Sequence, residues 1–217
     1  MKDRFCAKSN VYCAPGVCAV IENHLSKSDF ELLRRSCFGW VFVQRDKMKL
    51  NFQLIHQMML RLIKSDKLHE LWFKVDGLVA RFSLVEFHAI TGLPVIDTKV
   101  KPPAKFEWSY FLGEKQSKCT YDELLEAFKT CRKSSTKKLQ MAKLLIIEKM
   151  LLFKRSKSVK KDHATLVCNP AKCELYSWGR LSYSLVVKYL KKVLDCDRSN
   201  PRPSYKLFGY IYAFQVI

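Results

Sequence analysis

The stretch from Glu70 to Pro94, ELWFKVDGLVARFSLVEFHAITGLP, constrains the fold of this chain more than any other. Asp76 and Gly77 separate two apolar runs, and an Asp-Gly pair in that position is a strong β-hairpin signal because both turn residues adopt positive φ. A two-residue turn pairs Val75 with Leu78 and fixes the register of the rest. The sequence therefore predicts a hairpin at this point.

The two faces of the predicted hairpin differ in character. Alternation gives one wholly apolar face, which consists of Leu71, Phe73, Val75, Leu78, Ala80 and Phe82. We expect this face to pack on helices, because an isolated hairpin is only marginally stable in water. The other face is mixed and wetter, and on it Trp72 lies opposite Arg81, which favours a cation–π contact.

A capped helix is predicted directly after the hairpin. Ser83 and Glu86 have the spacing of a capping box, and Phe82 with Phe87 fits a hydrophobic staple. Gly92 suits the left-handed residue that ends many helices. Start, staple and stop agree within a dozen residues, which is stronger than any one signal alone.

Helical patterns dominate the remainder of the chain. A second capping box, Ser28 with Glu31, predicts another helix, and further helices are predicted over 51–63 and 139–153. One more begins at Thr120 or Ser117 and reaches Phe128, another begins at Ser182 or Ser184 and reaches Val193, and an apolar helix-like run is expected over 207–217. The fold class is therefore mainly α with one small β-hairpin. We expect an irregular or flexible N-terminus over 1–27 and a single globular domain over 28–217. Because the chain stops inside an apolar run, we also expect it to be truncated relative to its relatives, or a partner to cover this end.

The chain carries a formal net charge of +19, from 39 basic and 20 acidic residues. Such a charge bears on partners rather than on fold, and it favours nucleic acid, an acidic protein or another anionic surface. The nine cysteines and the polar start at Met1 indicate reduced thiols in an intracellular protein. The most apolar run, 139–153, is too short and too charged to span a bilayer, so no membrane partner is expected.

Two basic clusters are the positive functional signal. Twelve bases and one acid, Glu148, lie between Lys129 and Lys161, while the middle of this segment is apolar nearly all round and predicts a buried central helix. The bases therefore gather at its two ends, roughly 25–30 Å apart. The candidate contact residues for nucleic acid or an acidic partner are Arg132, Lys133, Lys137, Lys138, Lys154, Arg155, Lys157, Lys160 and Lys161. The run over 154–161 resembles a nuclear-import or phosphate-contact patch; solvated loops are the alternative interpretation.

Catalytic and cofactor chemistry finds no support in the sequence. Cys168 and Cys173 are five residues apart with His163 near, and Cys13 and Cys18 share that spacing, whereas structural zinc usually requires two closer pairs. None of the cysteines lies in a nucleophile signature, and no P-loop, dinucleotide fingerprint or HExxH motif occurs. The sequence thus predicts no catalytic, cofactor-binding or metal-binding residue, and a cofactor-free protein that is not an enzyme.

Several segments in order resemble one known family. They are KLNFQLIHQMMLR (49–61), LWFKVDGLVARFSLVEFHAITGLP (71–94), KLQMAKLLIIEKMLL (138–152), YSWGRLSYSLVVKYLKK (176–192) and YKLFGYIYAFQVI (205–217). The chain from about residue 30 onward is similar to the plant domain of unknown function 1985. The hairpin–helix–TGLP segment and the Trp-Gly-Arg segment are the most specific parts of this resemblance.

The resemblance implies a plant protein, often encoded with transposable elements. In that family the domain often precedes a SUMO-specific type of cysteine peptidase, whose His, Asp and Cys have no counterpart in this chain. We therefore expect an uncharacterised, non-enzymatic binding or targeting module, located in the nucleus rather than the cytoplasm. The alternative is a truncated accessory domain of a SUMO-peptidase-like protein with no independent activity. A cysteine hydrolase would need a Cys–His pair in a cleft.

Overall fold

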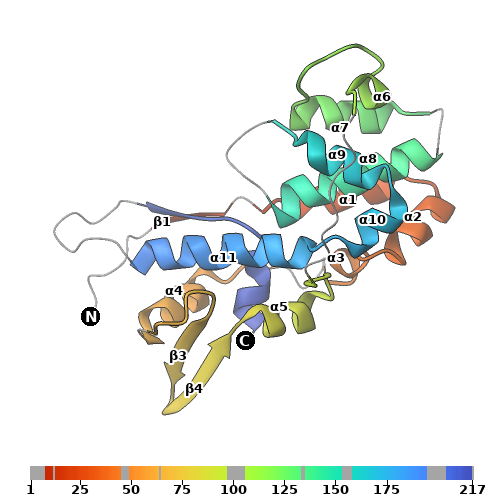
Figure 1. Cartoon of the computed structure of the whole chain (residues 1–217). Coiled ribbons are helices and arrows are strands. Elements are labelled where there is room, and N and C mark those ends of the chain that lie inside the picture. The colour runs from red at the N-terminus through yellow and green to blue at the C-terminus, as the bar shows by residue number, and fades with distance from the viewer. Residues whose placement is uncertain are drawn as a thin grey trace.

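The computed structural model of the chain describes residues 8–11, 13–44, 49–63, 65–96, 106–132, 135–152, 158–194 and 204–216. In chain order the elements are β1 (Lys8–Val11), α1 (Gly16–His24), α2 (Lys27–Arg34), α3 (Trp40–Gln44), α4 (Phe52–Leu60), β2 (Leu62–Ile63), β3 (Leu71–Val75), β4 (Leu78–Phe82), α5 (Leu84–Thr91), α6 (Ser109–Leu112), α7 (Tyr121–Thr130), α8 (Ser135–Ile146), the π-helical η2 (Ile147–Leu151), α9 (Lys161–Val167), α10 (Pro170–Leu175), α11 (Trp178–Leu194), β5 (Ser204–Leu207) and the 3-10 helix η3 (Ile211–Val216). These elements form a single, predominantly α-helical domain with little β structure (Figure 1). The predicted fold class is therefore confirmed.

The predicted hairpin is present with the predicted register. Strands β3 and β4 pair antiparallel, and the turn residues Asp76 and Gly77 have φ of 49° and 85°. A third strand was not expected: β2 pairs with β3, and α4 ends at Leu60 rather than at Ile63. Asn51 caps α4 as its spacing predicts, by accepting from the Leu54 amide.

The inner face of the hairpin packs as predicted only at its base. Phe73 and Phe82 are buried, and the ring of Phe214 from η3 lies 5.4 and 5.3 Å from theirs. Towards the turn, Val75 and Leu78 are exposed. The hairpin projects away from the described helices at its tip, and none of these helices covers the two side chains (Figure 1).

The start of α5 shows the predicted capping box. The Ser83 hydroxyl accepts from the Val85 amide, and a carboxylate oxygen of Glu86 accepts from the Ser83 amide at 2.7 Å. At the other end Gly92 is left-handed, with φ of 65°. Both signals therefore have the physical role that their positions indicated.

The cap of α2 differs from the prediction. Ser26 rather than Ser28 begins this helix, and its hydroxyl accepts from the amide of Asp29 at 3.1 Å. Asp29 is buried and its carboxylate accepts from the Ser26 hydroxyl in return. Asp29 therefore takes the position expected for Glu31, because a buried carboxylate needs a protein donor, whereas the exposed Glu31 can be satisfied by water.

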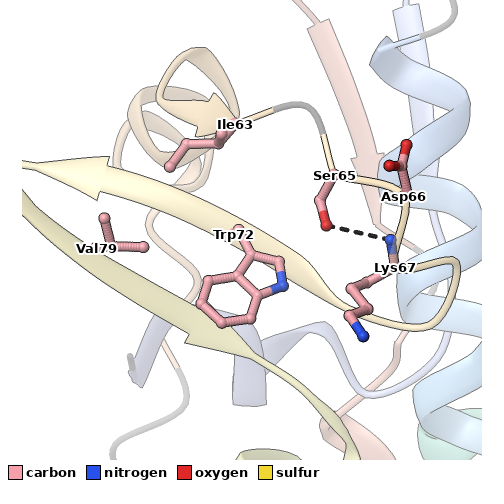
Figure 2. A pocket seen from close by; sticks show the side chains of 6 residues that line it. All are labelled: Ile63, Ser65, Asp66, Lys67, Trp72 and Val79. Carbon is pink, nitrogen blue, oxygen red and sulfur yellow. Dashed lines mark hydrogen bonds between the residues drawn. The ribbon is translucent and has the colours of Figure 1, made fainter.

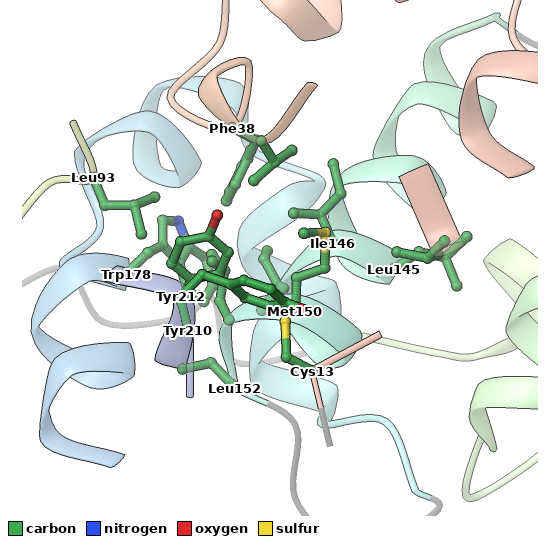
Figure 3. Packing of buried hydrophobic residues seen from close by; sticks show 14 of the residues in the cluster. Cys13, Phe38, Leu93, Leu145, Ile146, Met150, Leu152, Trp178, Tyr210 and Tyr212 are labelled. Atoms are coloured by element: carbon green, nitrogen blue, oxygen red, sulfur yellow. The ribbon is translucent and has the colours of Figure 1, made fainter. Parts of the chain in front are cut away.

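The centre of the core is α8 with η2, as the apolar run at 139–153 predicts. Its residues from Met141 to Ile147 are all buried. Figure 3 shows this helix meeting side chains from distant parts of the chain, among them Trp178, Tyr210 and Cys13. The amide of Ala14 also donates to the Lys149 carbonyl at 3.0 Å. The central helix thus joins both ends of the described chain.

Of the N-terminal segment over 1–27, which was expected to be irregular or flexible, residues 1–7 and 12 lie outside the described residues, and the described part contains regular structure instead. Residues of β1 pair in parallel with β5, and Gly16–His24 form α1, in which Val17, Cys18 and Ile21 are buried. Cysteine behaves here as a small apolar residue, which completes a helical stripe. The helix has no side-chain N-cap, so the usual start signal is missing from the sequence.

The C-terminal run over 207–217 is not a continuous helix. It begins in β5, and the 3-10 helix η3 follows after Gly209. Gly209 has φ of 77°, and a Cβ atom there would lie 2.6 Å from the Ser182 carbonyl oxygen. A left-handed residue tightly packed against α11 interrupts the helical pattern at this point.

Candidate functional site

The first predicted basic cluster lies where α7 ends and α8 begins. Arg132 is exposed directly after α7. Lys137 and Lys138 are half-buried and lie over the rings of Tyr110 and Phe128, each at 5.6 Å. Lys133 lies outside the described residues. The two ammonium groups therefore lie over aromatic rings, an arrangement typical of cation–π contacts.

The second predicted cluster is described only at its end. Lys154, Arg155 and Lys157 lie outside the described residues, whereas Lys160 and Lys161 are exposed.

The chain that leads into this second cluster is anchored beside α7. The Val159 amide donates to the Cys119 carbonyl at 2.8 Å, and Thr120 forms a bridge with Ser158. These contacts place the described part of the second cluster next to the start of α7.

The described ends of the two clusters consequently lie near opposite ends of one short helix: Lys138 near the C-terminal end of α7, and Lys160 near its start. Since α7 has 10 residues, this helix is about 15 Å long. The exposed surface of α7 between them carries Asp122, Glu123 and Glu126. Three carboxylates therefore interrupt the positive surface, and no unbroken basic strip crosses α7.

A basic surface that the sequence prediction did not single out lies on α11. This helix has 17 residues, WGRLSYSLVVKYLKKVL, with four bases and no acid. Arg180, Ser184, Lys188 and Lys192 are exposed and four residues apart, so they follow one side of the helix over about 18 Å. We call these four residues the α11 stripe. Figure 1 shows α11 running across the front of the molecule.

Tight packing on its other side holds the stripe at the surface. Tyr183, Val186 and Leu190 are buried, and the Tyr183 hydroxyl donates to the carbonyls of His69 and Phe82.

The two ends of α11 are also tied to loops. Near the C-terminal end the Lys191 ammonium donates to the carbonyls of Lys67 and Leu68, at 2.9 and 2.7 Å. At the other end the Gly179 amide donates to the Pro94 carbonyl at 2.9 Å. The helix therefore cannot rotate without breaking several bonds.

The signal for the α11 stripe was available in the sequence. The apolar positions of this helix predict which side is buried, and the bases fall on the opposite side with no acid among them. The segment 129–161 has a higher density of bases than α11, so a count of charge along the chain favours that segment instead. The even spacing of fewer bases on one long helix is a weaker compositional signal but a more continuous surface.

The histidine and cysteines that were weighed as metal ligands have other surroundings. His163 Nδ1 lies 2.6 Å from an oxygen of Glu148, which also accepts from the Lys160 amide. Glu174 accepts from the buried Lys143 ammonium at 2.7 Å. Within the described part of the chain, no group of three or more His, Cys, Asp and Glu is arranged to hold a metal ion.

Burial suppresses the reactivity of five of the described thiols. Burial raises the pKa of Cys168 to about 11 and the pKa values of Cys119 and Cys173 to about 12. It also raises the pKa values of Cys13 and Cys37. Because the thiolate is the nucleophile, these five cysteines are poorly suited to covalent chemistry near neutral pH.

A membrane-spanning helix is likewise missing from the described ranges, where no helix combines the length and the apolar character needed to cross a bilayer.

Comparison with known proteins confirms the resemblance that the sequence indicated. The model of the family described as Domain of unknown function (DUF1985) matches residues 59–189, from the end of α4 to within α11. No curated protein and no solved structure matches the chain. The match includes the hairpin, the TGLP turn, the central helix and the Trp-Gly-Arg segment, and it covers more than half of the sequence. The chain therefore belongs to the DUF1985 family.

Proposed function

We propose that this domain is a non-enzymatic binding module that contacts the phosphate backbone of nucleic acid through the α11 stripe. The observation that carries the proposal is a long helix that is free of acids and presents Arg180, Lys188 and Lys192 on one exposed side. Lysine and arginine on such a surface neutralise phosphates and release counterions. The module acts in the nucleus of a plant cell, in a protein associated with transposable elements.

The spacing of the α11 stripe suits backbone contact rather than base reading. Arg180 and Lys188 are about 12 Å apart along the helix, and Lys188 and Lys192 about 6 Å. Long basic side chains at these intervals can reach successive phosphates of one strand. The adjacent aromatic ring of Tyr189 lies only 4.2 Å from that of Phe208, so it already has a stacking partner. Binding is therefore expected to tolerate any base sequence.

The test removes two charges from the α11 stripe. Substitutions Lys188→Gln and Lys192→Gln together are expected to weaken binding to a fluorescein-labelled 25-base-pair DNA duplex. They are also expected to reduce the slope of log K against log salt by about 0.9 for each phosphate that is no longer neutralised. Fluorescence anisotropy between 50 and 200 mM salt measures both quantities.

The matched control is Lys115→Gln with Lys118→Gln, which removes the same charge from exposed positions in the loop before α7. It is expected to leave the slope close to that of the unaltered protein. An equal slope in the α11 variant, the control and the unaltered protein would refute the proposal. Binding of an acidic polypeptide but of neither DNA nor RNA would replace it with recognition of an acidic protein.

A further inference from the structure

The outer side of the three-stranded sheet exposes more apolar surface than packing requires. Ile63 and Val79 are exposed by 39% and 58%, and they come from β2 and β4. Single exposed apolar side chains are ordinary, but a contiguous group on one small sheet is typical of an interaction surface.

A groove opens on this side of the sheet. It has a volume of about 420 Å³ and is lined by Ile63, Ser65, Asp66, Lys67, Trp72 and Val79. Figure 2 shows Trp72 and Val79 on the same side of the sheet, with Lys67 close to the indole and Asp66 directed away from it.

The indole of Trp72 is held in place within the groove. Its N–H donates to Glu70 at 2.9 Å, and the Arg81 guanidinium lies 6.0 Å from the ring centre. Arg81 is itself held by Glu86, at 2.8 Å. The groove wall is therefore preorganised rather than loosely packed.

The neighbouring edge of β4 has backbone groups that face outward. The strand order is β2-β3-β4, so β4 lies at the edge of the sheet. The amide of Lys74 donates to the Arg61 carbonyl at 3.0 Å, on the β2 side. Val79, paired with Lys74, must then direct its amide and carbonyl away from β3, and Arg81 does the same two residues on. Among the described residues, no backbone hydrogen bond is made to either.

We propose that this edge and groove bind an extended segment of a partner protein, which adds a fourth strand beside β4. Val79 carries the inference because it both presents free backbone groups and lines the groove. A strand paired there places the side chain opposite Val79 on the groove side. Main-chain bonds then supply affinity, and the pocket supplies selectivity.

The chemistry of the groove specifies the segment. A large apolar side chain suits the position opposite Val79, because the groove is lined there by Ile63, Trp72 and Val79. Lys74 is exposed on the same side of the sheet as Trp72, and Lys67 lies beside the indole. Their charges favour an acidic residue two positions away from the apolar one, since side chains on one side of a strand recur every second residue.

The test uses a fluorescein-labelled synthetic peptide of alternating valine and threonine, with a central leucine and a glutamate two positions to each side. Val79→Pro removes the outward amide without removing a bond to β3, and proline is tolerated at a sheet edge. We expect this variant to bind the peptide at least tenfold more weakly. Replacing the glutamates by lysine is expected to weaken binding to the unaltered protein several-fold.

Leu78→Ser is the matched control, because Leu78 is exposed but lies on the opposite side of the strand with its backbone facing β3. It is expected to leave peptide affinity unchanged. Equal circular dichroism spectra and urea midpoints of Val79→Pro and the unaltered protein show that the variant is folded, and equal DNA affinity separates this surface from the α11 stripe. Equal peptide binding by Val79→Pro, or no binding by the unaltered protein, would overturn the proposal. A dimer that Val79→Pro abolishes would instead assign the edge to a second copy of this chain.

Discussion

Gly179 joins two segments of the family match, the Trp-Gly-Arg segment and the TGLP turn. Its amide bonds to the carbonyl of Pro94, in the TGLP turn, and the Arg180 side chain donates to the Val95 carbonyl at 3.3 Å. A Cβ atom on Gly179 would lie 2.9 Å from the Pro94 carbonyl oxygen and 2.8 Å from a methyl carbon of Val95. The Trp-Gly-Arg and TGLP sequences are therefore explained together, by a close approach of α11 to the end of α5.

This contact predicts that Gly179→Ala destabilises the domain. The added methyl group meets backbone that cannot retreat without breaking its bond to Gly179, so a cost of about 1–3 kcal/mol is expected. Urea denaturation followed by circular dichroism measures it. Gly16→Ala at the start of α1 is the control, since nothing lies within 4 Å of its added methyl group. Equal stability of the two variants would contradict the packing argument.

At the scale of single elements, the sequence predicted the turns and helix caps that are determined by residues close together in the chain. Asp76-Gly77 specified a turn and Ser83 with Glu86 specified a cap, because the physical cause of each lies within a few residues. Strand β2 was missed because Leu62 and Ile63 also fit the helical pattern before them, and only their pairing with β3 decides between the two. The choice of Ser26 over Ser28 likewise depends on which carboxylate becomes buried.

The cap of α5 predicts a specific dependence of stability on pH. Partial burial raises the pKa of Glu86, but hydrogen bonds from Ser83 and Arg81 outweigh it and lower the pKa to about 2. An unfolded glutamate has a pKa near 4.3, so the stabilisation is complete above that pH and is lost as the pH falls towards 2.

Glu86→Gln should therefore lower the free energy of unfolding by about 1 kcal/mol at pH 6 and by much less at pH 2.5, allowing for solvent screening. Chemical denaturation at the two pH values checks this difference. Glu114→Gln, at an exposed loop position, is expected to show no such difference. A loss that is the same at both pH values would refute the role assigned to the Glu86 carboxylate.

At the scale of the whole molecule, the sequence predicted the buried central helix but not the arrangement of charge around it. Burial of Met141 to Ile147 follows from an apolar run. The position of Lys160 near the start of α7 depends on contacts with Cys119 and Glu148 that no local pattern specifies. For the same reason, the acidic surface of α7 between the two basic clusters could not be foreseen.

The predicted 154–161 cluster can be tested against the α11 stripe. Replacing Lys154, Arg155, Lys157, Lys160 and Lys161 by Ala is expected to flatten the salt dependence of binding further, by about 0.9 for each phosphate that these side chains neutralise. Titrations against duplex DNA, single-stranded DNA and RNA measure the effect, with the Lys188 and Lys192 double variant as reference. Unchanged binding to all three would leave this cluster as a solvated loop.

The parallel pairing of β1 with β5 also bears on the order in which the molecule assembles. Lys8–Val11 leave the ribosome well before their partners Ser204–Leu207, which follow after nearly all of the described chain. During synthesis β1 therefore waits without its native neighbour while the helices between them condense. Contacts so distant in sequence form late and slow folding, because closing the long intervening loop costs entropy before any bond is gained. Pairing of β1 with β5 is therefore expected to be a late step that lowers the folding rate of the domain.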